Sequence, residues 1–332
     1  MCPVTPMSPA NVSRHASVSR HVTAMRPATP IRRTSPNVSV CNRDAPPQSS
    51  AWSPGRRGCP RISRARWSAR KRSEWLLRFA DVIEAHHEQL AQLKCADTGK
   101  PMTQAKGDIS ACARYFRFYG GAADKIHGET IPFETDFAVM TLREPYGVCA
   151  QIIPWNYPLS LMGWKLAPAL AAGNTIVMKP SEISSLSILH WVELAGGDLP
   201  AGVMNVVTGF GQEAGEALVK HPQVPIITFT GSVRTGKRIA RLAADNLKKV
   251  SLELGGKDPV IVCDDVDVEV AAKGACWGGF VNAGQVCTSV ERVYVYENVA
   301  ERFTEALVEE AKKVRIGDPM DNDTDVGPMS SK

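Results

Sequence analysis

The chain of 332 residues is expected to adopt an α/β fold in which helices cover both faces of a parallel sheet. From residue 148 onward, short apolar runs alternate with segments of helical spacing, the pattern of strand–helix–strand units. The length allows two domains with cores of their own. Hydrophobic residues at 44% and charged residues at 22% give the ordinary balance of a globular protein.

Strands are expected at the short apolar runs 148–153, 175–178, 204–207, 225–229, 250–254 and 259–262. Helices are expected between several of them, at 159–171, 184–195, 213–220 and 235–246. Two further helices, 266–281 and 299–314, flank a strand at 292–296, and Asn298 is a candidate cap for the second. These elements predict one domain over residues 67–257 and an incomplete second α/β domain over residues 258–332.

The helical part of the chain begins near Trp67, with Ser68 as a candidate cap. Apolar residues then recur at helical spacing as far as Leu93, and Gly99 and Pro101 are expected to end that helix. A second helix is expected at 108–119, ended by two glycines. Residues 128–150 alternate apolar and polar, which predicts a hairpin or an extended arm near residues 128–147.

Residues 1–66 differ in character from the rest of the chain. They contain eleven Arg, no Lys and one acid, Asp44, and show little hydrophobic periodicity. Three interpretations stay open: a disordered tail, an organelle transit peptide, and an out-of-frame or mis-started translation. Arginine without lysine, followed by an abrupt change near Trp67, favours the third, a non-native leader. At the other end, the chain stops after a polar loop, which suggests a fragment.

Charge and cysteine usage narrow the functional classes. The net charge is +5, of which residues 1–66 supply 11 − 1 = +10, so the remainder carries 5 − 10 = −5 and does not suggest a nucleic-acid surface. The nine cysteines are odd in number, widely spaced and without a C-x-x-C pair, which predicts neither a disulfide framework nor a metal site. We expect a reducing, cytoplasmic location, and no apolar run is long enough to cross a membrane.

A thiol and a carboxylate are the strongest candidates for chemistry. Cys287 ends the stretch F-V-N-A-G-Q-V-C, behind a small polar turn that we expect to be mobile. Glu253, in L-E-L-G-G-K, ends an expected strand, where partial desolvation would raise its pKa and suit it to proton abstraction. Together they suggest a nucleophile and a base. The alternatives are a small core hydrophobe for Cys287 and a strand-end charge facing water for Glu253.

Three other motifs are weaker when taken singly. Asn156, in I-P-W-N-Y-P, can donate a hydrogen bond to a developing oxyanion or can serve as a turn residue. Lys179 and Glu182, in M-K-P-S-E, can both reach a ribose diol or can belong to a solvated loop. The stretch F-T-G-S-V-R-T-G opens a helix whose amides can bind a phosphate.

In combination, these motifs resemble the aldehyde dehydrogenase superfamily, the NAD(P)-dependent enzymes that oxidise aldehydes through a cysteine thioester. The segments P-W-N-Y-P, W-K-L-A-P-A-L-A-A-G-N, K-P-S-E, F-T-G-S-x-x-x-G, L-E-L-G-G-K and N-A-G-Q-V-C stand in the family's order. The resemblance runs from about Trp67 to Lys332 and is nearest to the betaine-aldehyde and aminoaldehyde branch. It implies a Rossmann-like sheet, an incomplete catalytic domain and a small aldehyde as substrate.

The resemblance also implies roles for individual residues. Cys287 would be the nucleophile, Asn156 and the Cys287 amide the oxyanion donors, Glu253 the base that activates water, and Lys165 a proton relay. Glu182 would favour NAD over NADP, because its charge repels a 2′-phosphate. The remaining residues assigned to the cofactor are Trp155, Lys179, Gly231, Ser232, Gly236 and Leu254.

Some family features have no counterpart here. The family's first strands, a later glutamate that binds the nicotinamide ribose and the C-terminal strand used in oligomerisation are not recognisable, although a homo-oligomer is expected of the family. Two alternatives to a hydrolysing dehydrogenase remain. One is the CoA-acylating branch, against which Glu253 argues. The other is a truncated, non-catalytic chain that at most binds NAD. Tyr157, Trp164 and Trp277 are candidates for an aromatic substrate pocket, or for ordinary apolar packing.

Overall fold

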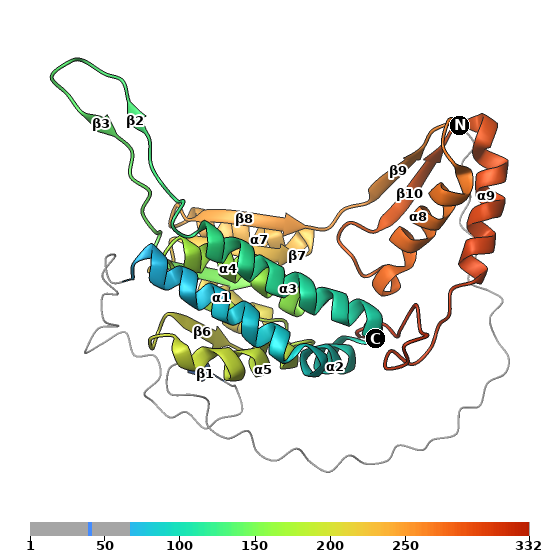
Figure 1. Cartoon of the computed structure of the whole chain (residues 1–332), viewed down its shortest axis with the longest axis horizontal. Helices are drawn as coiled ribbons and strands as arrows, with labels where there is room; N and C mark the ends of the chain where they lie inside the picture. Colours follow the sequence, from blue (N-terminus) through green and yellow to red (C-terminus); the bar gives the residue numbers. More distant parts are fainter. Residues whose placement is uncertain (1–38, 42–66, 332) are drawn as a thin grey trace, which may run out of the picture. The chain divides into compact units, whose positions relative to one another are not determined.

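A six-stranded parallel sheet is the centre of the fold (Figure 1). The computed structural model describes residues 39–41 and 67–331. The strands follow the order β1-β6-β5-β4-β7-β8, and each pairs in parallel with its neighbours. Their bounds are β1 Ser39–Cys41, β4 Val148–Ile152, β5 Thr175–Lys179, β6 Met204–Val207, β7 Ile226–Gly231 and β8 Lys249–Leu254. The α/β fold with a parallel sheet, predicted from the strand–helix alternation, is confirmed.

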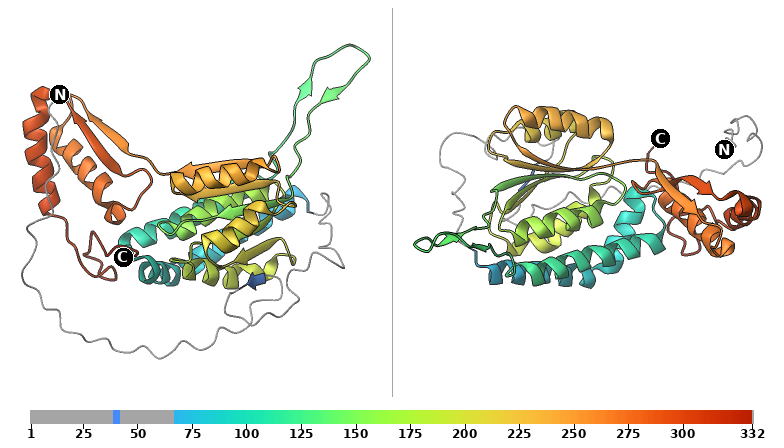
Figure 2. Two further views of the ribbon diagram at one scale, coloured as in Figure 1. Left: turned by 180° about the vertical axis from the view of Figure 1, so that it is seen from behind. Right: turned by 90° about the horizontal axis from the view of Figure 1, so that it is seen from above.

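Helices cover both faces of this sheet, as Figure 2 shows in its right-hand view. Successive residues of β4 point to opposite faces: Cys149 packs in the larger core with α1, α3, α4 and α5, whereas Ala150 packs in a separate core with α7. The helices are α1 Ala69–Ala85, α2 His87–Thr98, α3 Met102–Ala122, α4 Pro158–Ala171, α5 Leu186–Ala195, α6 Glu216–Lys220 and α7 Val233–Ala244. Short turns of other helix types are η1 Gly196–Asp198 and η2 Gly211–Gly215.

The first helices differ from the expectation in two ways. Ser68 caps α1 as predicted, since its Oγ accepts a hydrogen bond from the Lys71 amide at 3.2 Å. However, His86 leaves the helical conformation (φ −113°, ψ 24°), so the single expected helix is two, α1 and α2. Gly99 ends α2 in the left-handed region, as predicted.

Helix α3 extends beyond the expected 108–119 at both ends. It runs from Met102 through Gly120 to Ala122. A Cβ on Gly120 would lie 3.0 Å from Leu77 Cδ2 on α1, so the glycine allows the two helices to approach closely. Buried residues at helical spacing hold the whole length of α3 against its neighbours. The prediction that the glycine pair ends this helix was therefore wrong.

The arm expected near residues 128–147 is confirmed as a hairpin of β2 Thr130–Ile131 and β3 Val139–Met140, which pair antiparallel. Strand β1 was not expected; it adds three residues to one edge of the sheet beside β6. The interpretations of the rest of residues 1–66 lie outside the described residues. In the described ranges, no helix is both long and apolar enough to span a bilayer.

A smaller α/β unit follows β8. Strands β9 Asp258–Val262 and β10 Val290–Val295 pair in parallel, and helices α8 Val268–Phe280 and α9 Glu297–Lys312 share a small core with them, which includes Phe303. Asn298 does not cap α9, because that helix already begins at Glu297 after Tyr296. Strands β8 and β9 belong to different sheets. The domain boundary at residue 257 stays a prediction.

Three aromatic rings join the helices on one face of the sheet. Trp191 on α5 is fully buried and stacks on Phe116 of α3, with ring centroids 5.5 Å apart. Phe79 of α1 contacts both rings edge-on, at 5.3 Å from Trp191 and 5.7 Å from Phe116. Such pairs add to the stabilisation from burial alone, so this cluster holds α1, α3 and α5 together.

Replacing Trp191 by Ala should therefore lower the free energy of unfolding by about 3–5 kcal/mol, because it opens a cavity between three helices. Trp277, which is 70% exposed on α8, provides the control, and Trp277→Ala should change that free energy by no more than about 0.5 kcal/mol. Urea unfolding followed by circular dichroism measures both. Equal losses in the two variants would show that the aromatic cluster does not hold the helices.

Candidate active site

Most of the candidate residues stand where parallel strands end. Trp155 and Asn156 follow β4, Lys179 ends β5, Gly231 ends β7, and Leu254 ends β8. Because the strands are parallel, their carboxyl ends share one edge of the sheet, where α/β proteins bind their ligands. The sheet thus brings to one edge residues as distant in the sequence as Trp155 and Leu254, which are 254 − 155 = 99 positions apart.

The turn before Cys287 has an unusual backbone. Asn282, Ala283 and Gly284 of η3 (Val281–Gly284) all have positive φ, at 53°, 57° and 73°. The left-handed region is unfavourable for alanine and tolerable for asparagine. Asn282 is 2% exposed. The backbone amide of Asn282 donates to Gln104 Oε1 at 3.0 Å. The expected loose approach to the thiol was therefore wrong, since hydrogen bonds hold this turn.

Asn156 contacts the same turn. Its Nδ2 donates to the backbone carbonyl of Gln285 at 2.9 Å, and Asn282 Nδ2 donates to that carbonyl at 3.2 Å. Gln285 Nε2 in turn donates a hydrogen bond to the Asn282 carbonyl at 2.9 Å. Gln285 Oε1 accepts a hydrogen bond from the Ser330 amide at 3.1 Å. The segment two residues before Cys287 is thereby fixed against the end of β4.

Cys287 itself is exposed. Its backbone amide has no hydrogen-bond partner among the described residues, so it is free to donate to a bound oxygen. Tyr157 lies close by: burial raises the pKa of the Tyr157 phenol, and the negative charges of Asp108 and Cys287 add to the effect. An accessible thiol with a free amide and a neighbouring Asn amide is an arrangement that can bind a carbonyl and hold its oxyanion.

Glu253 is exposed on β8, in contrast to the expected desolvation. Strand β8 is at the edge of the sheet, where no further described strand covers it. Glu253 interacts with Lys165 of α4, whose pKa burial lowers to about 8 while the Glu253 charge opposes that shift. The predicted base and the predicted proton relay are therefore brought together, with the base open to water.

Lys179 and Glu182 form the expected pair beyond β5. Lys179 is 3% exposed, and its Nζ donates to Glu182 Oε2 at 3.2 Å and to the Pro180 carbonyl at 2.9 Å. The Glu182 side chain is 40% exposed, so its carboxylate is available to a ligand. A ribose diol needs one donor and one acceptor at this spacing, and the pair supplies both.

The start of α7 fits a phosphate group. Ser232 caps this helix, and its Oγ accepts from the Thr235 amide at 3.2 Å. A Cβ on Gly231 would lie 2.5 Å from the Phe229 ring, and one on Gly236 would lie 2.6 Å from Leu254. Glycine at both positions therefore allows Phe229 and Leu254 to lie against the backbone where α7 begins. Helix N-termini of this kind bind anions, so the residues assigned to NAD are compatible with a dinucleotide.

An aromatic groove of about 520 Å³ lies between α3 and α4. Its lining is Ala111, Arg114, Tyr115, Phe118, Tyr119 and Trp164. Of the three aromatic residues expected to line a substrate pocket, only Trp164 belongs to this groove. Trp277 stands 70% exposed on α8, and Tyr157 faces buried lysines instead.

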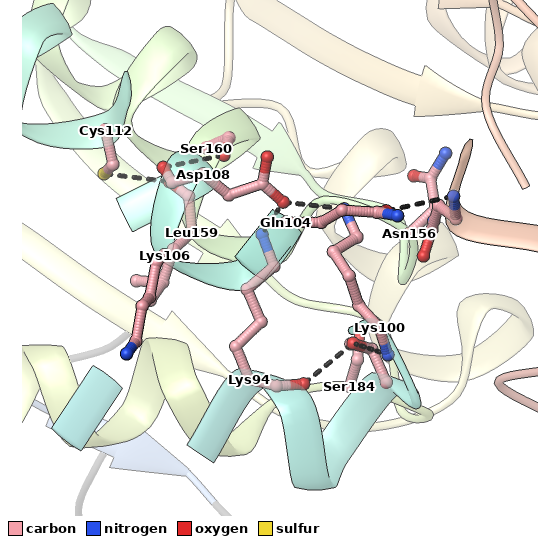
Figure 3. Close-up of polar contacts among 12 residues, drawn as sticks. Lys94, Lys100, Gln104, Lys106, Asp108, Cys112, Asn156, Leu159, Ser160 and Ser184 are labelled. Atoms are coloured by element: carbon pink, nitrogen blue, oxygen red, sulfur yellow. Dashed lines mark hydrogen bonds and ion pairs between the residues drawn. The ribbon is translucent and has the colours of Figure 1, made fainter. Parts of the chain in front are cut away.

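The sequence analysis missed a group of residues beside the site. Lys94, Lys100 and Asp108 form a buried charged cluster at the junction of α2 and α3, which Figure 3 shows together with Asn156 and Gln104. Hydrophobic periodicity cannot identify a buried charged residue, because lysine and aspartate give the same sequence pattern when they lie on an exposed helix face. Gln104 offers no motif either, although it binds the Asn282 turn.

Comparisons with known proteins agree with this geometry. Residues 56–332 match the aldehyde dehydrogenase family. A hydroxyisobutyraldehyde dehydrogenase of Mycolicibacterium austroafricanum is 45% identical over 262 residues, which are 79% of this chain and 52% of that protein. The mitochondrial aldehyde dehydrogenase family 2 member B4 of Arabidopsis thaliana is 49% identical over 267 residues, 79% of this chain and 49% of that protein.

Solved structures show the same likeness. PnpE in complex with nicotinamide adenine dinucleotide is 48% identical, with a TM-score of 0.78 over 79% of this chain and 54% of that one. Betaine aldehyde dehydrogenase from Staphylococcus aureus in complex with NAD+ is 40% identical, with a TM-score of 0.79 over 81% of this chain and 54% of that one. The chain spans about half the length of the relatives it matches. By sequence and by structure, it belongs to the aldehyde dehydrogenase family.

Proposed function

We propose that this protein oxidises an aldehyde to a carboxylic acid with NAD, with Cys287 as the nucleophile. The observation that supports it most is the hydrogen bond from Asn156 to the Gln285 carbonyl, which brings an oxyanion donor to the segment that carries the thiol. The electrostatic interaction of Glu253 with Lys165, a lysine whose pKa burial lowers to about 8, supports the assignment of these two residues as base and proton relay. Nucleophile, oxyanion donors and base are the three parts that a thioester mechanism needs.

The reaction follows from these parts. The Cys287 thiolate attacks the carbonyl carbon, and the carbonyl electron pair moves to the oxygen, which the Asn156 and Cys287 amides stabilise. Bound NAD supplies the acceptor for the hydride that leaves this carbon. Cys287 then carries a thioester. Glu253 removes a proton from water, which attacks the thioester carbon and releases the acid and the thiolate, and Lys165 is positioned to pass that proton on.

Lys179 and Glu182 would hold the adenosine ribose, and Ser232 with the first amides of α7 would hold the pyrophosphate. Gly231, Gly236 and Leu254 would shape that part of the site, and Trp155 would form one wall. Since the Glu182 carboxylate is accessible, its charge would repel a 2′-phosphate, which favours NAD over NADP.

The first alternative, CoA release of the thioester, is less favoured because Glu253 is accessible to water, as hydrolysis requires. The second alternative, a chain that binds NAD without turnover, is separated from the proposed dehydrogenase by measuring NAD binding and turnover in the same preparation. A cytoplasmic location stays a prediction, and two relatives carry the word mitochondrial in their names. A homo-oligomer likewise stays a prediction.

The aromatic groove is the best candidate for the non-reacting part of the substrate, because aromatic side chains of α3 and Trp164 of α4 line it. The resemblance favours a cationic aldehyde such as betaine aldehyde, and aromatic faces do attract quaternary ammonium groups. Arg114 on the same groove would repel such a cation. We therefore propose neutral aromatic or anionic aldehydes as the better substrates, with the betaine-aldehyde branch as the second choice.

Cys287→Ala should abolish NADH formation from short aldehydes, by about 10³-fold or more, because it removes the atom that bonds to the substrate. Titration of NAD by quenching of tryptophan fluorescence should give the same dissociation constant in both proteins. Cys263→Ala, at a second exposed thiol, is the control and should retain turnover. Equal rates for wild type and Cys287→Ala would remove Cys287 from the mechanism; NAD binding without any wild-type turnover would favour the non-catalytic alternative.

Glu253→Gln should stop the reaction after hydride transfer. We expect a burst of about one NADH per chain, followed by a steady rate about 10²–10⁴-fold below wild type, because only water activation is lost. Rapid-mixing absorbance at the NADH band measures both phases, and Glu291→Gln on β10 serves as the control. A full steady rate in Glu253→Gln, or a wild-type enzyme that needs CoA for turnover, would contradict the assigned role.

Arg114→Gln should raise kcat/KM for betaine aldehyde by about 3–10-fold, since it removes a positive charge that repels the substrate cation. The effect is modest because water and salt screen part of that repulsion. The value for benzaldehyde should change little. Arg117→Gln is the matched control on the same helix, because Arg117 pairs with Asp81 and Glu84 on α1 and does not line the groove. If the ratio of kcat/KM for betaine aldehyde to kcat/KM for benzaldehyde were the same in wild type, Arg114→Gln and Arg117→Gln, the groove would be excluded from substrate selection.

A further inference from the structure

The buried cluster of Lys94, Lys100 and Asp108 carries unequal charges. The Nζ atoms of both lysines contact the same oxygen, Asp108 Oδ2, at 2.6 Å in the case of Lys100. Both lysine side chains are fully buried, and the Asp108 side chain is 17% exposed. Figure 3 shows the two lysines converging on that carboxylate. With both protonated, two cations share one anion, and such an excess of buried charge is unfavourable unless another group stabilises it.

Tyr157 is the group that faces the excess charge. Lys100 Nζ lies 3.2 Å from the centroid of the Tyr157 ring, and Lys94 Nζ lies 5.5 Å from it. A desolvated cation over an aromatic face is a strong form of cation–π contact. The titratable groups that face Lys100 among the described residues are thus Lys94 on α2, Asp108 on α3 and Tyr157 before α4.

Tyr157 connects this cluster to the candidate active site. It directly follows Asn156, whose amide binds the Gln285 carbonyl, and its phenol feels the charge of Cys287. A chain of contacts therefore runs from the Asp108 carboxylate through Lys100 and the Tyr157 ring to Asn156 and the Gln285 carbonyl, two residues before the thiol. Nothing in the proposed reaction uses Lys100, and Lys94 alone would neutralise the Asp108 carboxylate.

We propose that Lys100 is a positioning residue for Cys287: its ammonium group holds the Tyr157 ring, which keeps Asn156 and the turn before the thiol in place. The proposal rests on the function proposed above, in which Cys287 is the nucleophile. It assigns Lys100 no contact with substrate or cofactor, so its effect must pass through Tyr157.

The charge on Lys100 should be sensitive to pH near neutrality. Burial and the charge of Lys94 together lower the pKa of Lys100 to about 7, against the opposing effect of Asp108. Below that pH the ammonium form holds the ring; above it the neutral amine does not. Lys100→Met never carries the charge and should therefore differ from wild type below about pH 7. Lys100→Arg always carries it and should differ from wild type above about pH 7.

The test is the rate at which iodoacetamide alkylates Cys287 in the full chain, followed by mass spectrometry of the peptide that contains it. At about pH 6, Lys100→Met should be alkylated about threefold or more slowly than wild type, because the Tyr157 ring loses the cation that holds it and the turn that keeps Cys287 exposed loosens with it, and Lys100→Arg should match wild type. At about pH 8.5, Lys100→Met should match wild type, and Lys100→Arg should be the faster.

Two further variants separate positioning from general destabilisation. Lys106→Met removes a lysine of α3 that pairs with Glu88 at the surface, at 3.0 Å, and should leave the rate unchanged. In a Tyr157→Leu background, Lys100→Met should have no further effect, because the ring that the ammonium group holds is gone. The proposal would be overturned if the ratio of alkylation rates between Lys100→Met and wild type stayed constant from pH 6 to pH 8.5. It would also be overturned if Lys100→Met slowed alkylation equally in the Tyr157→Leu background.

The measurement stands apart from the proposed function, because alkylation requires neither NAD nor turnover. If Cys287→Ala retained turnover, the proposed function would fail while the alkylation rates still reported on Lys100. Should Lys100→Met not fold, the comparison of Lys100→Arg with wild type across the same pH range still decides, since identical profiles would exclude a role for the charge.

Discussion

The bond from Asn156 Nδ2 to the Gln285 carbonyl is the contact on which the candidate site depends. It joins the loop after β4 to the turn that carries the thiol, 129 positions later in the sequence. The Asn156 Oδ1 atom is buried without a partner in the described part of the chain, so the amide is oriented by what its nitrogen binds. Because Nδ2 has two hydrogens, one can hold the turn while the other remains for an oxyanion.

The parallel sheet explains how such distant residues meet. Each strand–helix unit returns the chain to the same side of the sheet, so every new strand delivers its last residues to one edge. Lys179, Gly231 and Leu254 need no special folding signal to converge; they need only stand at strand ends. The separate requirement is a small backbone at the start of α7, which Gly231 and Gly236 meet by allowing Phe229 and Leu254 to approach.

Sequence reasoning predicted this architecture well, because strand and helix periodicities are local. The Ser68 cap, the left-handed Gly99 and the hairpin arm follow from neighbouring residues alone. The errors arise from contacts between distant segments. Gly120 looks like a helix stop until Leu77 packs on it, Glu253 looks desolvated until β8 proves to be an edge strand, and the Asn282 turn looks mobile until Gln104 binds it. The charged cluster at Lys100 was missed for the same reason.

Gln104 holds two segments beside the candidate site. Its Oε1 accepts from the Asn282 amide, and its Nε2 donates to the Asp325 carbonyl at 2.9 Å. One side chain at the beginning of α3 thus ties together two segments that follow it by 178 and 221 positions. Variation at Gln104 would alter the reactivity of the thiol and the order of the final loop at the same time, although Gln104 itself does not line the aromatic groove.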